Sequence, residues 1–287
     1  MISQIIINSI YTGSIYALIA FGFTLIYSTM NHFNMAYGAT VMVAGYVFYC
    51  LYTLLKMPLF VSIILSCIVM TTFMIGVDRL CYYHFRKKRV PKWTTVVMSM
   101  SVATLLGAVM SIIFGNRAKV VYEGIPEIFR VGSFSVTSLQ ILVFTTAVAI
   151  MLAMSILLRK TRYGKLIRAV ANNKDMALTV GVNVESVFLV VIALGTSLAT
   201  CAGCFMSMDS GIRPMMASTA LLKAICTSIV GGVGNIKGAL IAAFIFGFIE
   251  NFSVLYIGGG WRDALPIVII VVMMLIRPAA FGITDNS

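Results

Sequence analysis

The chain has 287 residues, of which 60% are hydrophobic and 10% charged, and its 21 Lys and Arg exceed its 9 Asp and Glu to give a net charge of +12. Soluble domains carry about 25% charged residues, so this composition excludes an ordinary soluble protein and indicates an integral membrane protein. The apolar runs continue for about twenty residues, which favours transmembrane helices over the short alternating strands of an outer-membrane barrel.

The apolar runs begin at the N-terminus, where residues 1–55 contain no Lys, Arg, Asp or Glu. We predict spans at residues 5–26, 35–55, 59–77, 93–114, 139–158, 187–208, 239–257 and 264–276. The run 217–230 is only marginally long enough to cross, so we expect eight spans if it is re-entrant and nine if it crosses. The predicted fold class is an all-α polytopic membrane protein with about eight (8–9) transmembrane helices, broken or re-entrant segments and a two-half pseudo-repeat, in a single transmembrane domain over residues 1–287.

Two basic clusters orient the chain in the membrane. Eleven of the Lys and Arg residues lie at 86–92 and 159–174. Such clusters mark loops on the inner face, which also explains the positive net charge without any nucleic acid. The mixed charges of residues 116–138 indicate an outer loop with short structure. The side of the N-terminus stays open, because residues 1–4 carry no charged side chain.

The longest polar interruption is the loop 159–186. Its first part, 159–168, holds most of the cations and is expected to orient the chain and to form solvated surface. Its second part has helical composition at residues 174–178, and Gly181 is placed to end that helix. We therefore predict a short docking helix at about residues 172–179.

Two interruptions rich in Gly or Asn lie toward opposite ends of the chain, at 27–38 and 231–238. Interrupted helices in two halves of a transporter indicate a substrate pathway near the membrane midplane. The polar side chains of the first interruption either line a pore or hydrate a turn. The candidate pathway residues in the two interruptions are Asn31, His32, Asn34, Tyr37, Gly38, Gly231, Gly232, Gly234 and Asn235.

Glu250 is a further pathway candidate, because it lies inside the apolar run 239–257. A carboxylate within a span indicates substrate binding or gating by default, and the alternative is a structural bond to a neighbouring helix.

A charged cluster near one end of a span consists of Asp209, Arg213 and Lys223. These three either meet an extracytoplasmic partner or are solvated, with Lys223 extending toward the surface.

The residue patterns of an enzyme are missing from the sequence. Its two histidines, His32 and His84, show neither the spacing of metal ligands nor that of a Ser-His-Asp triad. The Gly-rich segment 231–238 lacks the Gly-Lys-Ser/Thr ending of an ATP-binding loop. We predict no catalytic residue, no cofactor and no metal.

Four stretches of the sequence carry a family resemblance. They are 13–26 in the first span, 34–46 from the first interruption onward, 161–183 in the basic loop, and 231–250 with the closing Arg277 and Pro278. In this order and spacing they resemble the permeases of branched-chain amino acid ABC transporters of the high-affinity LivH type, a family that also contains urea and short-amide permeases. Tyr37 stands where that family usually has His, and Lys237 stands where Pro is common.

The resemblance implies the permease subunit of an ABC importer that moves leucine, isoleucine or valine across the bacterial inner membrane. It implies these partners: a second, paralogous permease in a heterodimer, two cytosolic ATP-binding subunits that supply the energy, a periplasmic substrate-binding protein, and membrane lipid. It places ATPase coupling in the basic loop, at Arg168, Asn172, Asn173, Lys174, Asp175, Ala177 and Gly181. The alternatives are a urea, short-amide or other small-solute ABC permease, and a stand-alone secondary transporter that would use Glu250.

Overall fold

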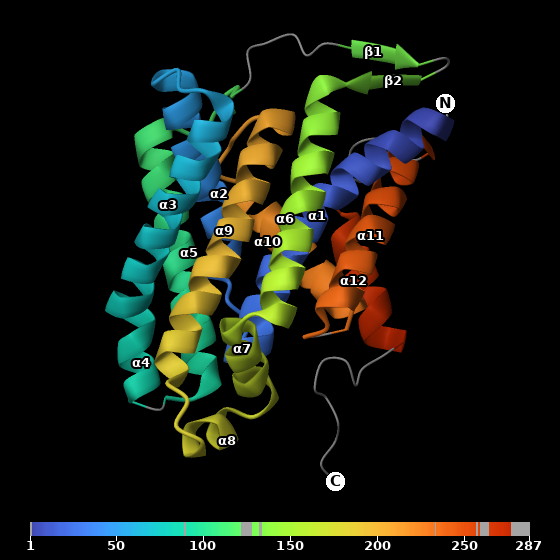
Figure 1. Ribbon diagram of the computed structural model, residues 1–287. Coiled ribbons are helices and arrows are strands. Elements are labelled where there is room, and N and C mark those ends of the chain that lie inside the picture. Colours follow the sequence, from blue (N-terminus) through green and yellow to red (C-terminus); the bar gives the residue numbers. More distant parts are fainter. Residues whose placement is uncertain are drawn as a thin grey trace.

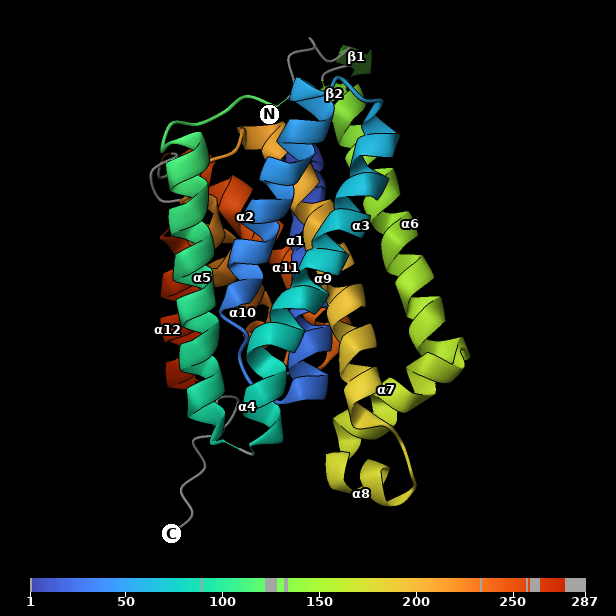
Figure 2. The same ribbon diagram turned by 90° about the vertical axis from the view of Figure 1, so that its left-hand side faces the viewer.

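Backbone amides find no water inside a bilayer, so the apolar runs form helices that bond these groups internally. The computed structural model describes residues 2–88, 90–121, 128–131, 134–232, 234–256, 258 and 264–276, and its long helices pack side by side into a bundle (Figures 1 and 2). The elements in chain order are α1 (Ile2–Met30), α2 (Ala36–Tyr49), the π-helical turn η1 (Cys50–Leu54), α3 (Leu59–Val77), the π-helical turn η2 (Asp78–Tyr82), α4 (Tyr83–Lys87), α5 (Lys92–Phe114), β1 (Ile128–Val131), β2 (Phe134–Thr137), α6 (Ser138–Lys160), α7 (Arg162–Asn172), α8 (Lys174–Thr179), α9 (Val184–Ser210), α10 (Met216–Val230), α11 (Ile236–Tyr256) and α12 (Leu265–Ile276).

The helical, polytopic fold predicted from the sequence is confirmed. Seven stretches of the described residues are helical, long and apolar enough to cross a membrane, namely Gln4–Met30, Ala36–Leu54, Leu59–Lys87, Trp93–Phe114, Ser138–Lys160, Val184–Ser210 and Ile236–Val254. The third of these is longer than the prediction of 59–77, because α3 continues through η2 into α4. The outer loop contains the expected short structure, an antiparallel hairpin in which Ile128 pairs with Thr137.

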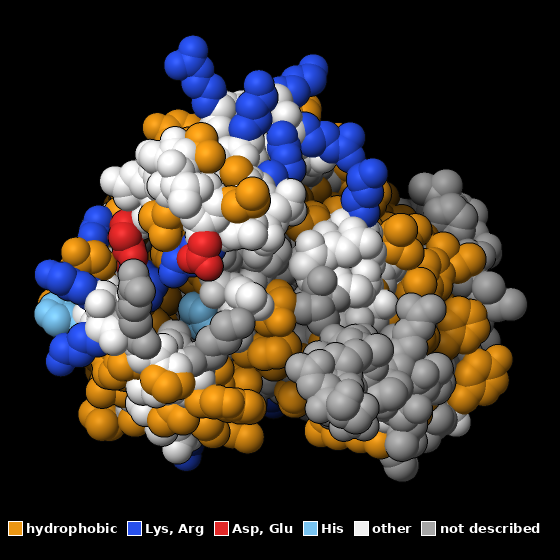
Figure 3. Space-filling model, turned by 90° about the horizontal axis from the view of Figure 1, so that it is seen from below, with side chains coloured by type: hydrophobic (Ala, Val, Ile, Leu, Met, Phe, Trp, Pro, Cys, Tyr) orange, Lys and Arg blue, Asp and Glu red, His pale blue; other side chains and the backbone are white. Residues whose placement is uncertain are grey.

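The two ends of the bundle are distinguished by charge. Arg86 of the first basic cluster and Lys174 of the second line the same cavity, and Lys and Arg side chains gather on this face (Figure 3). The positive-inside rule makes it the inner face. Gln4, near the start of α1, accepts a hydrogen bond of 3.0 Å from the backbone N–H of Ser135 in the hairpin at the opposite end (Figure 1). The start of α1 therefore lies on the outer side, which the sequence alone left open.

Helix α10 is shorter than the seven stretches that are long enough to cross, and it covers only part of the passage from the outer to the inner side. It descends in the same direction as α1, since Lys223 meets Tyr16 and, further on, Thr24 donates a hydrogen bond of 3.1 Å to Ser228. Helix α9 ends on the outer side and α11 starts on the inner side (Figure 1). With 15 residues, α10 is about 22 Å long, so the non-helical segment 211–215 before it supplies part of the crossing.

The two interruptions contain the turns that follow α1 and α10, and a pathway through them at the membrane midplane stays a prediction. Asn31 (φ 53°) terminates α1, and the Asn34 side chain accepts a hydrogen bond of 3.0 Å from the N–H of Ala36 at the start of α2. Gly232 and Gly234 have φ values of 90° and 84° and turn the chain from α10 into α11. The two turns meet, because a Cβ on Gly234 would lie 3.8 Å from the Cβ of Ser28.

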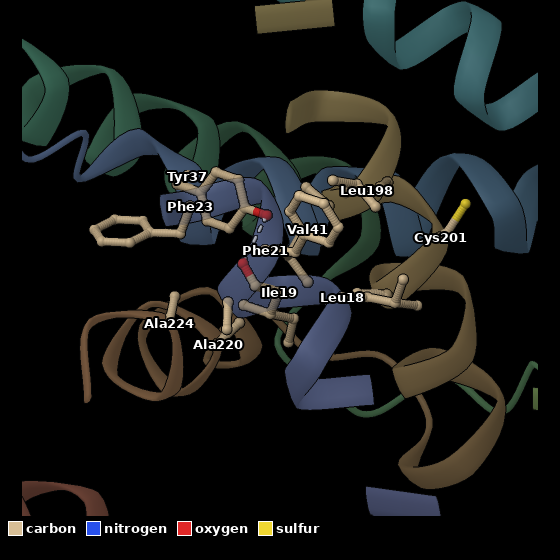
Figure 4. Close-up of a cluster of buried hydrophobic side chains, with 14 of the residues drawn as sticks. Leu18, Ile19, Phe21, Phe23, Tyr37, Val41, Leu198, Cys201, Ala220 and Ala224 are labelled. Carbon is tan, nitrogen blue, oxygen red and sulfur yellow. Dashed lines mark hydrogen bonds between the residues drawn. The ribbon is translucent and has the colours of Figure 1, made fainter. Parts of the chain in front are cut away.

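Helix α1 forms the centre of the bundle, where α6, α9, α10 and α11 pack around it. Glycine allows the helix backbones to approach closely, because a Cβ atom added at these positions would collide with the neighbouring helix. A Cβ on Gly22 would lie 2.9 Å from the carbonyl oxygen of Gly195 in α9. Figure 4 shows the adjacent core, in which the Tyr37 hydroxyl donates a 3.0 Å hydrogen bond to the carbonyl oxygen of Ile19. Helix α1 can be surrounded this closely only because small residues lie at its crossings.

Gly247→Ala is expected to destabilise the bundle, because the added Cβ would lie 2.6 Å from the carbonyl oxygen of Ser9 and 2.7 Å from the N–H nitrogen of Gly13. Overpacking of this kind costs about 1–3 kcal/mol, which exceeds the roughly 1 kcal/mol that Ala gains over Gly within a helix. Gly107→Ala in α5 is the matched control, since its Cβ would meet no described atom within 4 Å. Thermal unfolding in detergent measures both variants, and equal midpoints would contradict the close contact of α1 with α11.

Candidate functional site

The segment that projects from the inner end begins with α7. One face of this helix is buried, with Gly164, Ile167 and Val170 at a spacing of three residues. A Cβ on Gly164 would lie 2.1 Å from the carbonyl oxygen of Leu158, so α6 and α7 meet in a tight corner. The Arg168 guanidinium donates to that same carbonyl oxygen. Arg168 thus holds the corner between α6 and α7, and the first half of the basic loop is a packed amphipathic helix in addition to solvated surface.

Helix α8 confirms the short helix predicted at about residues 172–179. The Asn173 side chain caps its start by accepting hydrogen bonds of 3.0 Å from the N–H groups of Asp175 and Met176. Gly181 (φ 83°) ends it, as predicted. The N–H of Gly181 donates to Leu178 and that of Val182 donates to Ala177, both at 3.0 Å. This pair of bonds is a Schellman motif, which needs a residue in the left-handed region.

The tip of α8 exposes apolar side chains to solvent. Met176, Leu178 and Val180 are 68%, 50% and 83% exposed, while Ala177 packs inward with 5% exposure. Three large apolar side chains at one exposed tip indicate a surface that another protein covers. Lys174 lies over the Phe188 ring of α9, with its Nζ 5.5 Å from the ring centre. Helix α8 is therefore connected to a transmembrane helix as well as being open to a partner.

A cavity of about 590 Å³ opens on the inner face between α8 and the turn after α1. Its lining brings predicted pathway residues together with predicted coupling residues. Asn31 and His32 come from the first group, and Asn172, Lys174 and Asp175 come from the second. The His32 ring nitrogen Nδ1 lies 3.1 Å from the carbonyl oxygen of Met30. The two groups of residues, predicted for separate tasks, meet at one place.

Arg86 forms an ion-pair cluster at the edge of this cavity. Its guanidinium donates two hydrogen bonds to the Asp78 carboxylate, at 2.6 and 2.7 Å, and two to Glu185, at 3.0 and 3.3 Å. The Asp78 side chain is only 3% exposed. The Arg86 Cζ also lies 5.3 Å from the Phe188 ring centre. Arg86 therefore ties η2 and α4 to the start of α9, close to α8.

Glu250 has partners that the sequence did not reveal. Its carboxylate accepts a 2.6 Å hydrogen bond from the Tyr16 hydroxyl and lies 3.4 Å from the Lys223 ammonium group, which also donates to that hydroxyl. Glu250, Tyr16 and Lys223 are 2%, 3% and 5% exposed. The expectation that Lys223 reaches the surface is therefore wrong. An ammonium group at this depth is neutralised more favourably by a carboxylate from the next helix.

This buried cluster forms the floor of a second cavity, of about 250 Å³, on the outer side. Tyr16 and Lys223 contribute to its lining from the buried end, and Asp209 and Arg213 are exposed at its rim. The full lining is Thr12, Ile15, Tyr16, Met206, Asp209, Ser210, Gly211, Arg213, Met216, Thr219 and Lys223. The charged residues that the sequence placed near one end of a span thus surround a hollow between α1, α9 and α10.

The remaining pathway candidates lie either in the packed core or at the turn between α10 and α11. Tyr37 is 1% exposed within the core, and a Cβ on Gly38 would lie 2.2 Å from the carbonyl oxygen of Ala217 in α10. Gly231 packs as closely, since its Cβ would lie 2.2 Å from the Ala239 nitrogen, and Asn235 caps α11 by accepting from Gly238 at 3.2 Å. In the described structure these residues shape the bundle, and a role in the pathway stays a prediction.

Sequence reasoning missed Arg86 and the two partners of Glu250. One signal was present, namely opposite charges in the apolar runs 217–230 and 239–257. Buried ionic groups in spans pair with one another, so Lys223 and Glu250 could have been matched. For Arg86 the signal is weaker, because a spacing of eight residues does not by itself indicate a pair with Asp78, and Glu185 lies 99 residues away at the start of α9.

Comparison with known proteins gives a consistent result. The model of the family described as "Branched-chain amino acid transport system / permease component" matches residues 5–276. The high-affinity branched-chain amino acid transport system permease protein BraD of Pseudomonas aeruginosa is 28% identical, with 96% of this chain and 94% of that protein covered. The corresponding permease protein LivH of Escherichia coli (strain K12) is 26% identical, with 96% and 93% covered.

A solved structure shares the fold. A chain of PsaBC from Streptococcus pneumoniae in complex with Fab superposes with a TM-score of 0.50, covering 95% of this chain and 90% of that chain. The two are 13% identical in sequence, so the likeness concerns the arrangement of the helices alone.

Glu250→Gln is expected to destabilise the protein, because it leaves the buried Lys223 charge without its counter-ion. Breaking a buried ion pair in this way costs about 3–5 kcal/mol, whereas removing both charges is far less damaging. The double variant Glu250→Gln with Lys223→Met should therefore recover most of the loss. The free energy of unfolding in detergent, measured for both single variants and the double variant, gives the coupling. Simple addition of the two single effects would show that the pair contributes nothing.

Arg86→Gln is expected to destabilise the inner end by about 3–5 kcal/mol, since Asp78 is left as a buried carboxylate without its cation. Arg86→Lys should recover only part, because an ammonium group cannot form the two parallel bonds of a guanidinium. Arg79→Gln, in the adjoining turn η2 but exposed, is the matched control and should change little. The comparison is made by thermal unfolding, where equal shifts for Arg79→Gln and Arg86→Gln would refute the cluster.

Proposed function

Because the chain belongs to the family of permease components of branched-chain amino acid transport systems, we propose that it moves leucine, isoleucine or valine across the bacterial inner membrane. Its role is that of the permease subunit of an ABC importer, a multi-pass membrane protein in which the long apolar helices enclose the path. Relatives that cover nearly the whole chain are named as permease proteins of such transport systems. The proposed activity is transport, and ATP hydrolysis is assigned to separate subunits.

Four partner subunits complete the proposed importer. A second, paralogous permease forms the other half of the membrane path, two cytosolic ATP-binding subunits attach to the inner face, and a periplasmic binding protein delivers cargo to the outer face. The family supports ATPase and binding-protein partners in general. The two faces of this chain suit that arrangement, since the inner one presents α8 and the outer one a charged cavity.

The observation that carries the coupling proposal is the exposed apolar tip of α8. Met176 and Val180 are more than two-thirds exposed although α8 itself is held by a cap at each end. A short helix with fixed ends and an apolar tip is suited to insert into a groove of a partner. We assign that groove to an ATP-binding subunit, because α8 lies on the basic, inner face.

Movement of α8 has a direct route to the transmembrane helices. Lys174 and Arg86 both lie over the Phe188 ring, and Arg86 also binds Asp78 and Glu185. Displacement of α8 would therefore act on the start of α9 and, through Arg86 and Asp78, on η2. The inner cavity lies between these elements. ATP binding by the partner would shift α8 and thereby change the width of this cavity, which is the inner half of an alternating-access cycle.

Replacing Met176 and Val180 by Ser is expected to leave the permease folded, because both side chains are exposed in the isolated chain. In the complex each buried side chain contributes about 1.5–3 kcal/mol to binding, so the double variant should bind the ATPase at least about tenfold more weakly. ATP-driven uptake of leucine into vesicles should fall accordingly, with ATPase activity no longer stimulated by cargo.

Val120→Ser is the matched control. Val120 is also apolar and is 66% exposed, but it follows α5 on the outer side of the bundle. It should leave both ATPase binding and uptake unchanged. Normal coupled uptake by the double variant in α8 would refute the docking role of this tip, whereas loss of the folded protein would be seen directly by size-exclusion chromatography.

A further inference from the structure

The described lining of the outer cavity, together with Glu250 behind Lys223, carries charges of both signs. Asp209 and Arg213 lie at its rim, while Lys223 at its floor is paired with Glu250. These residues contribute two negative and two positive charges. A ligand with a net charge would be attracted by one rim residue and repelled by the other, whereas a zwitterion is attracted by both. The electrostatics of the cavity therefore favour a ligand with an ammonium and a carboxylate group.

The backbone before α10 adds to this preference. Residues 211–215 are not helical, and α10 starts at Met216 without a side-chain cap. Gly211, Arg213 and Met216 all line the cavity. Non-helical backbone at membrane depth is tolerated where it lines a water-filled cavity, and the first N–H groups of the following helix favour an anionic group nearby. The start of α10 therefore strengthens the attraction of Arg213 for a carboxylate.

The rest of the lining suits a small apolar side chain. Ile15, Met206 and Met216 provide apolar surface beside the charged rim. The cavity volume of about 250 Å³ lies just below the range of roughly 300–1,000 Å³ that is typical of sites for drug-sized ligands. A single amino acid fits that size, whereas a folded peptide does not.

We propose that the outer cavity is a binding site for the zwitterionic head group of the transported amino acid, with Arg213 bonding the carboxylate and Asp209 the ammonium group. The proposal rests on the proposed function for the identity of the cargo, and it adds a substrate site within the permease itself. Lys223, Tyr16 and Glu250 act as positioning residues. They join α10, α1 and α11 beneath the ligand and so hold the site in shape.

The test measures binding of radiolabelled L-leucine to the assembled importer in lipid nanodiscs, with the periplasmic binding protein omitted. Arg213→Gln and Asp209→Asn should each weaken binding by about tenfold or more, because each removes a charge-assisted hydrogen bond. Arg117→Gln, an exposed arginine outside the cavity lining, is the matched control and should bind as the unmodified protein does. Neither 4-methylpentanoate, which lacks the ammonium group, nor 3-methylbutylamine, which lacks the carboxylate, should compete.

Three results would overturn the site. One is undiminished leucine binding by both cavity variants, and another is competition by either single-charge analogue as strong as that by leucine. The third is leucine binding that stays unchanged while the variants lose only the stimulation of ATPase activity by the binding protein, since the rim would then be a protein-docking surface.

A parallel assay separates this proposal from the proposed function. ATP-driven leucine uptake by the complete importer tests the transport of branched-chain amino acids. If uptake is normal and the cavity variants transport at the unmodified rate, the site is wrong and the function stands. If the unmodified importer does not take up leucine, isoleucine or valine, the function is wrong, while loss of leucine binding in the two variants would still support the site.

Discussion

Ionised groups inside a bilayer are stable only where groups of opposite charge reach them, and this constraint decides how α1, α10 and α11 meet. A single charge at the centre of a span costs about 2.5–3.5 kcal/mol even on the lenient insertion scale. Lys223 and Glu250 lie in different helices, and their ion pair of 3.4 Å is joined by the Tyr16 hydroxyl from a third. The pair therefore fixes the depth of each helix relative to the others, and it closes the outer cavity from below.

The same constraint operates at the inner end with different partners. Arg86 binds Asp78 and Glu185, so the end of one helical stretch is held to the beginning of α9. Between the two charged clusters the helices meet through glycine and other small residues, where the contact is close and depends on shape. A bundle built in this way transmits displacement along whole helices, because its core is packed and its ends are tied. That property suits the proposed movement of the inner face by an ATP-binding partner.

The parts of the fold that sequence reasoning predicted well depend on local properties of the chain. Helices α5 and α6 begin and end within two residues of the predicted spans, because each is a continuous apolar run bounded by polar residues. Helix α8 was predicted from composition and from Gly181, and its left-handed backbone at that position is a local requirement. The helix α7 was missed, since its buried face of Gly164, Ile167 and Val170 packs against neighbours that the sequence does not place.

The candidate site was predicted less completely, for a related reason. Asn31, His32, Asn172 and Lys174 were chosen from separate stretches, and the structure brings them to a single inner cavity. Tyr37 and Gly38 instead lie in packed core, where they fill and shape the bundle. Polar or Gly-rich composition marks a break in a helix, but whether the break faces water or a neighbouring helix depends on the packing around it.

By itself the sequence determined the membrane setting, the position of nearly every span, the inner side of the basic loops and the family. These follow from transfer free energies and charge bias, which add along the chain without reference to distant residues. Only the tertiary structure decided that α10 runs alongside α1 toward the inner side, that α1 starts on the outer side, and that Lys223 pairs with Glu250. Each of these depends on contacts between residues far apart in the chain, and such contacts are set by how the helices pack in three dimensions.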